Sequence, residues 1–221
     1  MKRRELLAAL AASGTAAVAG CAGEDGNYEF DAEPARVPES AYAESDYTGQ
    51  EPESFTIERE FNVTGANAEV SATTWIARYT NQTVGSALFV ASTPNASVVG
   101  QSVNPLVRVE GAELIRRLLE QVNQQGVGGD GTEIQADDIE SRGEETRTVL
   151  GVETTISIFE TTVSAEVSGS DGQSGEVDDI PVLLYIATVE DGEDVIAALG
   201  VHPVEIDQSE QLLSLMEAIE H

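Results

Sequence analysis

The chain has 221 residues, of which 40 are acidic and 11 basic, giving a formal net charge of −29. Such a charge argues against a nucleic-acid partner, because phosphate binding needs clustered Lys and Arg side chains. The two histidines, His202 and His221, leave little material for a histidine-based zinc site or catalytic triad. We therefore expect neither a metal nor a cofactor.

The first residues have the order of an export signal. Lys2, Arg3 and Arg4 form a basic start, an Ala-rich apolar run follows over 6–19, and small residues lead to Cys21. The run is shorter than the roughly 20 apolar residues that a membrane-spanning helix requires. Arg3 and Arg4 resemble the twin-arginine motif, which routes folded proteins for export. Residues 1–20 are thus predicted to be a signal peptide.

Cys21 ends a Val-Ala-Gly-Cys stretch that resembles a lipobox, in which the cysteine takes a diacylglyceryl group and becomes the first mature residue. A thiolate is the nucleophile that this transfer needs, and Cys21 is the only cysteine of the chain. Two acyl chains hold a protein to a bilayer far more firmly than one. We expect Cys21 to anchor the mature chain to the outer face of the cell membrane.

The composition beyond residue 20 is that of a halophilic protein. The first twenty residues contain three of the 11 basic residues and one of the 40 acidic ones, so the remainder has 8 and 39 and a net charge of −31. All eight are arginine. Self-repulsion of this size is screened at molar salt, where the Debye length is about 3 Å. The acidic residues are spread along the chain, which favours a solvated surface over a patch for one cationic partner.

Residues 21–54 are predicted to be an acidic tether and edge segment that leads into one globular domain over 55–221. Three prolines and an excess of Asp and Glu are typical of such a tether. Within it, Tyr28 and Phe30 favour an edge strand, and 38–47 favours a short helix that begins with Pro38.

Alternating apolar residues predict a strand over 55–63, with Phe55 and Ile57 on its inner face. Strands follow at 68–79, where Trp75 and Tyr79 share a face as a buried aromatic pair, at 86–92 and at 96–103. An apolar stripe predicts a helix over 111–125, and a Gly-rich acidic loop over 126–138 ends this half.

The second half predicts strands at 146–150 and 152–167, a polar loop at 168–179, and a hairpin of 180–190 with 193–201 around Asp191-Gly192. A last helix starts at Asp207, with Glu210 at capping-box spacing. Strands in series with two principal helices predict an α+β fold, a mainly antiparallel sheet with its helices on one face. The pattern is loosely similar to the Mog1 and PsbP-like architecture, a likeness that carries no function.

The remaining motifs do not assemble a reaction centre. The loop around Asp130 fits neither an EF-hand nor a phosphate loop, and His202 before Pro203 is expected to be a turn residue. Carboxylates are so abundant that a catalytic acid/base pair stays open. Asn62, Asn81 and Asn95 each begin an N-glycosylation triplet.

Several short stretches in a fixed order resemble a group of exported haloarchaeal lipoproteins that share a domain of unknown function. The stretches are Arg3-Arg4 through Cys21, Ala32-Glu33-Pro34-Ala35 with Val37-Pro38, Arg59-Glu60-Phe61, Trp75 with Tyr79, Ser92-Thr93-Pro94, Gly100 with Asn104-Pro105, Thr148-Val149-Leu150-Gly151, and Gly200-Val201 with Pro203. The resemblance implies membrane attachment and no known activity. We expect a non-catalytic binding or assembly module whose ligand, protein or small molecule, is unknown. The alternatives are a solute-binding lipoprotein of a transporter and a carboxylate-based surface hydrolase.

Overall fold

The computed structural model describes residues 21–22, 27–63, 66–98, 101–102, 132–134, 139–168 and 174–221. Within these residues, ten strands form one large sheet, and a short strand pair, β6 (Ser97–Val98) with β7 (Gln101–Ser102), stands apart from it. The predicted signal 1–20 with Arg3 and Arg4, the predicted helix 111–125 and most of the loop 126–138 lie outside the described residues.

The N-terminal half of the sheet is built around β4 (Ala66–Asn81). One edge of β4 pairs along its length with β3 (Thr48–Val63), and the other edge pairs with β2 (Asn27–Asp31) and then with β5 (Ser86–Pro94). The β2–β4 pairing is parallel, whereas the other pairings of the sheet are antiparallel. The predicted strands 55–63, 68–79 and 86–92 are confirmed within longer strands.

The C-terminal half continues in the order β5, β12 (Asp194–Pro203), β11 (Ser174–Asp191) and β10 (Val152–Ser168). The outer edge of β10 pairs with β9 (Glu140–Val149) and with β8 (Thr132–Ile134). The predicted hairpin is confirmed, with its turn at Gly192-Glu193, where Gly192 has a φ of +62° that suits glycine.

The predicted polar loop 168–179 is wrong over most of its length. Ser168 pairs with Ser174, so β10 and β11 extend as a ladder through this region and only 169–173 lie outside the described residues. Polar side chains on strands can face solvent at a distal hairpin, where burial does not impose an alternating apolar pattern.

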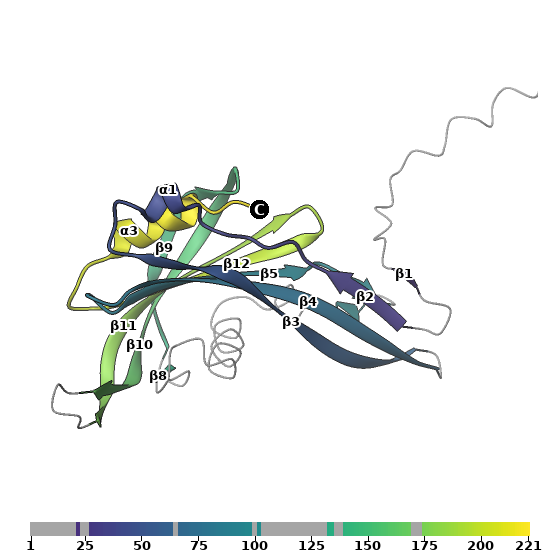
Figure 1. The fold of residues 1–221 in the computed structure, drawn as a ribbon, viewed down its shortest axis with the longest axis horizontal. Coiled ribbons are helices and arrows are strands. Elements are labelled where there is room, and N and C mark those ends of the chain that lie inside the picture. Colours follow the sequence, from purple (N-terminus) through teal and green to yellow (C-terminus); the bar gives the residue numbers. More distant parts are fainter. Residues whose placement is uncertain are drawn as a thin grey trace, which may run out of the picture.

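Two helices lie on one face of the sheet, α1 (Glu39–Tyr42) and α3 (Ser209–Glu217), as Figure 1 shows. The stripe predicted for α3 is confirmed, since Leu212, Leu215, Met216 and Ile219 are all buried in the core that the helix shares with β4, β5 and β12. At Gly200 of β12, a Cβ atom would lie 3.1 Å from the Met216 Cε atom, so glycine there allows α3 to approach the sheet closely.

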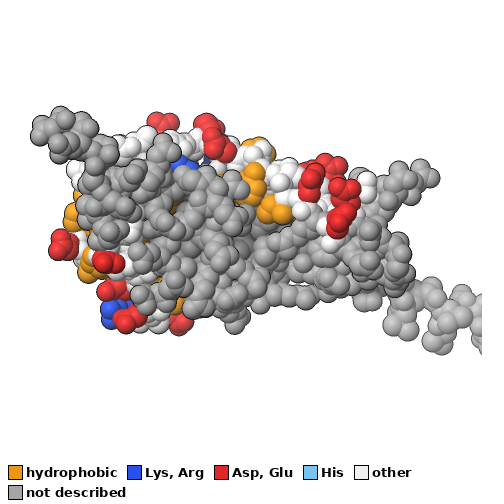
Figure 2. All heavy atoms as spheres, turned by 90° about the horizontal axis from the view of Figure 1, so that it is seen from below, with side chains coloured by type: hydrophobic (Ala, Val, Ile, Leu, Met, Phe, Trp, Pro, Cys, Tyr) orange, Lys and Arg blue, Asp and Glu red, His pale blue; other side chains and the backbone are white. Residues whose placement is uncertain are grey.

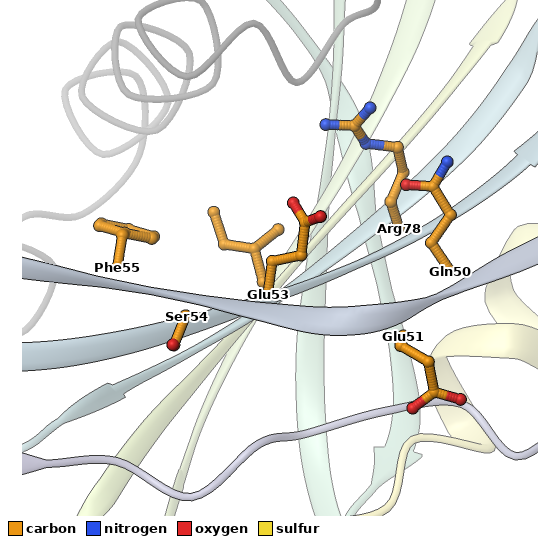
Figure 3. A pocket seen from close by; sticks show the side chains of 7 residues that line it. Gln50, Glu51, Glu53, Ser54, Phe55 and Arg78 are labelled. Atoms are coloured by element: carbon orange, nitrogen blue, oxygen red, sulfur yellow. The ribbon is translucent and has the colours of Figure 1, made fainter.

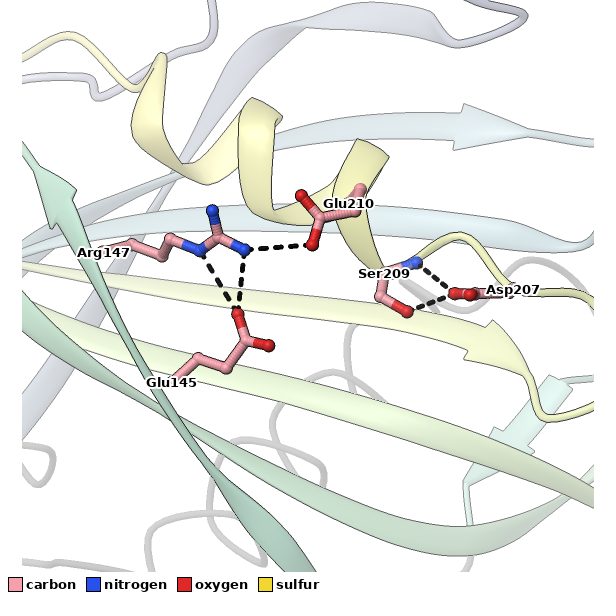
Figure 4. A network of polar contacts seen from close by, with 5 residues as sticks. All are labelled: Glu145, Arg147, Asp207, Ser209 and Glu210. Atoms are coloured by element: carbon pink, nitrogen blue, oxygen red, sulfur yellow. Dashed lines mark hydrogen bonds and ion pairs between the residues drawn. The ribbon is translucent and has the colours of Figure 1, made fainter.

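The predicted capping box of this helix is not formed. The helix begins two residues later than predicted, and Asp207 accepts hydrogen bonds from the main-chain N–H and hydroxyl of Ser209 (Figure 4). Glu210 does not reach back to the helix start, because its carboxylate pairs instead with Arg147 of β9 at 3.1 Å. A tertiary ion pair has replaced the local contact.

Residues 27–54 belong to the sheet and its core. The predicted strand and short helix are confirmed as β2 and α1, but β2 is not at the edge of the sheet, because β1 (Cys21–Ala22) pairs with its outer side. Ala35, Val37 and Tyr47 are buried in the main core. The expected start of the globular domain at residue 55 falls inside β3, which begins at Thr48. The outward carboxylates give this segment the composition of a tether, while its inward residues hold it on the fold.

Candidate functional site

A groove lies where the segment 33–36, the start of β3 and the residues after α3 meet. It encloses about 510 Å³ and is lined by Glu33, Pro34, Arg36, Glu51, Pro52, Trp75, Glu220 and His221. A further hollow of about 330 Å³ shares Arg36, Glu51 and Pro52 with it and continues toward Tyr42 and Tyr79. The two hollows form one groove on the helical face, which we call the 33–52 groove.

Aromatic side chains fix the backbone wall of the 33–52 groove. The Trp75 indole N–H donates to the Ala32 carbonyl at 2.8 Å. The Tyr79 hydroxyl accepts from the Val37 N–H at 2.6 Å and lies 3.2 Å from the Val37 carbonyl, to which it donates. Burial raises the pKa of Tyr79, which stays a neutral donor. Trp75 and Tyr79 therefore hold the segment after β2 against the sheet. The buried pair predicted from their shared face is confirmed for Tyr79, whereas Trp75 is only half-buried.

The residues after α3 close one end of the groove. Glu220 forms an isolated antiparallel bridge with Arg36, with main-chain N–H to carbonyl distances of 2.9 and 2.8 Å. The His221 imidazole is only 7% exposed, and its two nitrogens lie 3.0 Å from Asp191 Oδ2 and 3.2 Å from Asp194 Oδ2. Asp194 also accepts the Glu33 N–H at 2.8 Å. We call His221, Asp191, Asp194 and Glu33 the clasp, because they tie three separate segments together.

The clasp carries opposed electrostatic effects. Burial favours the neutral imidazole, but the carboxylates of Asp191 and Asp194 outweigh it and raise the pKa of His221 above its ordinary value. Burial likewise raises the pKa of the Asp194 carboxyl, although the Glu33 N–H and His221 lower it in part. Below the ordinary imidazole pKa of about 6.5, His221 is therefore protonated and forms charge-assisted hydrogen bonds in the groove wall. Ser92, fully buried, lies 3.5 Å from His221 Nε2 and is closed to a substrate.

Acidic side chains that line the 33–52 groove have no ion pair. Glu33, Glu39, Glu51 and Glu220 make none with a described residue, and Arg36 is the one arginine among the groove residues. Elsewhere the arginines of β9 are paired: Arg142 with Glu140 and Glu160, and Arg147 with Glu145 and Glu210 (Figure 4). On the visible part of the opposite face, acidic side chains stand in separate groups (Figure 2).

A smaller cavity of about 100 Å³ lies at the bulge of β3, lined by Gln50, Glu51, Glu53, Ser54, Phe55, Ile76 and Arg78. The ladder shifts here, since Gln50 pairs with Arg78 and Glu53 with Ile76. As a consequence, Glu51 and Glu53 point to opposite sides of the strand (Figure 3). The Arg78 guanidinium lies over Phe89 at 5.9 Å, and its Nε has no hydrogen-bond partner among the described residues.

His202 belongs to the core. It is 1% exposed, stacks on Tyr185 at 5.5 Å and has Nδ1 2.8 Å from the Pro203 carbonyl. Because that carbonyl can only accept, Nδ1 carries the proton and Nε2 accepts from the Tyr185 hydroxyl at 3.2 Å. The expectation of a turn residue at the strand end is thus corrected: His202 lies within β12 and is satisfied by buried partners.

The other residues singled out in the sequence do not converge. Cys21 lies in β1 (Cys21–Ala22), opposite Glu29 of β2. Asn62 pairs with Asn67 across the β3–β4 hairpin, and the Asn95 N–H donates to the Glu193 carbonyl. The Asn81 side chain is largely buried and accepts the Thr83 N–H at 3.1 Å, so its amide is closed to modification once the chain has folded.

The clasp was missed by sequence reasoning. His221 has no helical or strand spacing to Asp191 and Asp194, and only the folded sheet brings the β11–β12 turn to the residues after α3. In the parts of the chain that the structure describes, no group of three or more His, Cys, Asp or Glu side chains is arranged to hold a metal ion. Nor does any described helix have the length and apolarity to cross a membrane.

The fold and the groove define an α+β domain with one large, mainly antiparallel sheet and a groove along the segment 33–52, which we call the N-terminal strap. Residues 34–220 match the family described as Domain of unknown function (DUF6517), and the chain belongs to that family. No curated protein matches the chain. The matched range contains the whole helical face and every groove residue except Glu33 and His221.

Proposed function

We propose that this protein is an exported, lipid-anchored binding module of a haloarchaeon, held to the outer face of the cell membrane through Cys21, with its ligand in the 33–52 groove. The observation that carries the binding role is the groove itself, which encloses about 510 Å³. It is lined by the half-buried Trp75 and by the carboxylates of Glu33, Glu51 and Glu220, which make no ion pair with a described residue. The anchoring role rests on the basic start, the short apolar run and the lipobox-like end at Cys21.

Salt adaptation is supported by the charge of −29, by the absence of lysine after position 2 and by the scattered acidic side chains. The predicted test is far-UV circular dichroism during dialysis from molar KCl into dilute buffer, in which the domain should lose structure as screening is withdrawn. A spectrum unchanged in dilute buffer would count against salt adaptation.

The binding module is better supported than the alternatives. A transporter-type solute-binding protein needs two lobes around its cleft, and the 33–52 groove is built on one sheet and its strap. A carboxylate-based hydrolase needs a carboxyl group with a strongly shifted pKa that faces the concave site. Asp194, the acid whose pKa burial raises, is instead enclosed in the clasp. The likeness to the Mog1 and PsbP-like architecture remains part of the proposal and adds no activity to it.

A Cys21→Ser variant tests the anchoring role. We expect the native chain to sediment with membranes and partition into detergent, and the variant, which lacks the thiol that would receive lipid, to appear in the soluble fraction outside the cell. A Ser13→Ala variant in the same signal is the matched control and should leave the native distribution unchanged. Membrane retention of Cys21→Ser would contradict the proposal.

A further inference from the structure

The chemistry of the 33–52 groove indicates a class of ligand. Trp75, its aromatic floor, is the only tryptophan of the chain, and its N–H is already taken by the Ala32 carbonyl. The indole therefore has no polar group left to offer a ligand and presents its ring. A tryptophan ring is the best of the aromatic faces for binding an organic cation.

The charges around Trp75 favour the same class. Glu33, Glu51 and Glu220 line the groove beside it, and none of them is neutralised by an ion pair with a described residue. One opposing cation, Arg36, lies among them. When it is protonated, His221 offsets part of this negative charge, although its imidazole faces the carboxylates of Asp191 and Asp194. The groove as a whole is negative.

An acidic surface alone would not single out this place, because the whole chain is acidic. The combination is what distinguishes it: a tryptophan side chain, three carboxylates that make no ion pair with a described residue, and the hollow of about 510 Å³ that they line together. An exposed carboxylate on a flat strand, such as Glu58 of β3, lacks both the ring and the hollow.

We propose that the 33–52 groove binds a small organic cation, with its ammonium group on the Trp75 ring between Glu33, Glu51 and Glu220. The inference rests on the proposed binding role of the groove and gives it a ligand class. The cationic group can be a guanidinium or a quaternary ammonium group. It can belong to a free solute or to a basic side chain of a peptide.

The clasp gives this inference a pH signature with a defined sign. The groups that face His221 are Asp191, Asp194 and the Ser92 hydroxyl, with Glu33 and Glu220 next to it in the groove wall. A cation in the groove is repelled by the protonated imidazole. Affinity for a cation therefore rises as the pH rises through the titration of His221, whereas affinity for an anion held by Arg36 and His221 would fall.

The experiment is a fluorescence titration of Trp75 in the folded full-length domain, at fixed ionic strength. The probes are tetramethylammonium chloride, N-acetylargininamide, a short peptide with one internal arginine, and sodium propionate as the anion. We expect tetramethylammonium and the argininamide to change the Trp75 emission saturably, with tighter binding at pH 9 than at pH 6. The peptide separates the two sources of the cation: stronger binding than the argininamide indicates a peptide ligand, and weaker binding a free solute.

Glu51 and Glu53 provide a matched pair of variants on one strand, because they point to opposite sides of β3 (Figure 3). Glu51→Gln should weaken cation binding about threefold, the size expected for one partly exposed charge contact, and Glu53→Gln should leave it unchanged. Circular dichroism verifies that each variant is folded.

Three results would overturn the inference: a saturable response to propionate without one to the cations, equal effects of Glu51→Gln and Glu53→Gln, or no response to any probe. A response to propionate would leave the groove a binding site and retain the proposed function with another ligand class. Failure of the Cys21 experiment would instead remove the anchor and leave the ligand inference untouched.

Discussion

Replacing His221 tests the clasp. In a His221→Ala variant the hydrogen bonds to Asp191 at 3.0 Å and Asp194 at 3.2 Å are lost, and the 5% exposed Asp194 keeps only the Glu33 N–H. Hydrogen bonds to charged groups contribute about 1.5–3 kcal/mol each, and part of this is recovered when water enters beside the half-exposed Asp191. We expect a loss of about 2–3 kcal/mol in the free energy of unfolding near pH 6.

The loss should depend on pH in a defined direction. The pKa of His221 is raised in the folded state, so its stabilising contribution is complete below the unfolded value of about 6.5 and disappears as the pH rises through the folded value. The raised pKa of Asp194 acts in a separate window, since the carboxyl is favoured in its protonated form and adds stability only in the acid range. The difference between native chain and His221→Ala should therefore shrink from pH 6 to pH 9.

The assay is urea unfolding at constant salt, followed by circular dichroism at both pH values. Asp191→Asn serves as a control that removes the exposed partner and should cost less than His221→Ala, and a double-mutant cycle with Asp194→Asn isolates the buried contact. A His221→Ala effect below about 0.5 kcal/mol at pH 6, the range of ordinary surface substitutions, would refute the reasoning. So would an effect that grows toward pH 9.

Three further predictions concern the fold and share the same unfolding assay. Tyr79→Phe should cost about 1–3 kcal/mol, because the buried Val37 N–H loses its acceptor; no loss would show that water replaces the hydroxyl. Gly200→Val should lower the free energy of unfolding by about 1–3 kcal/mol, because the larger side chain forces α3 away from β12. A Cβ atom alone would lie 3.1 Å from Met216 Cε and 3.3 Å from Leu212 Cδ1. A variant as stable as the native chain would contradict that packing. Arg147→Met should leave the urea midpoint close to that of the native chain, because Glu210 is 81% exposed; a marked fall in the midpoint would mean that the ion pair holds α3.

The sequence predicts a strand well in two cases. Either one side of the strand is buried, so that its apolar residues alternate, or a recognisable turn joins the strand to the next one. The 180–201 hairpin was foreseen because Asp-Gly lies between two apolar runs, and the stripe of α3 because its apolar residues recur at helical spacing. The residues at 174–179 have no alternating apolar pattern, so the sequence predicts a loop where the structure has the first part of β11.

Long-range contacts explain the remaining differences. The capping box failed because Arg147, 63 residues before Glu210 in sequence, competes for its carboxylate. The groove could be foreseen only through the shared face of Trp75 and Tyr79. The groove carboxylates cannot be recognised from sequence, because they do not stand out among 40 acidic residues. The partners of His221, Asp194 and Asp191, lie at the β11–β12 turn, 27 and 30 residues earlier in the chain.

Mass spectrometry of residue 21 tests the central claim most directly. The chain is purified from membranes of its own host, and the peptide that contains Cys21 is measured after proteolysis. The account predicts that the mature chain begins at Cys21 and that this residue carries the mass of a diacylglyceryl group. A peptide that continues through Gly20 into an unmodified Cys21, or a mature chain with a free thiol at this position, would contradict it.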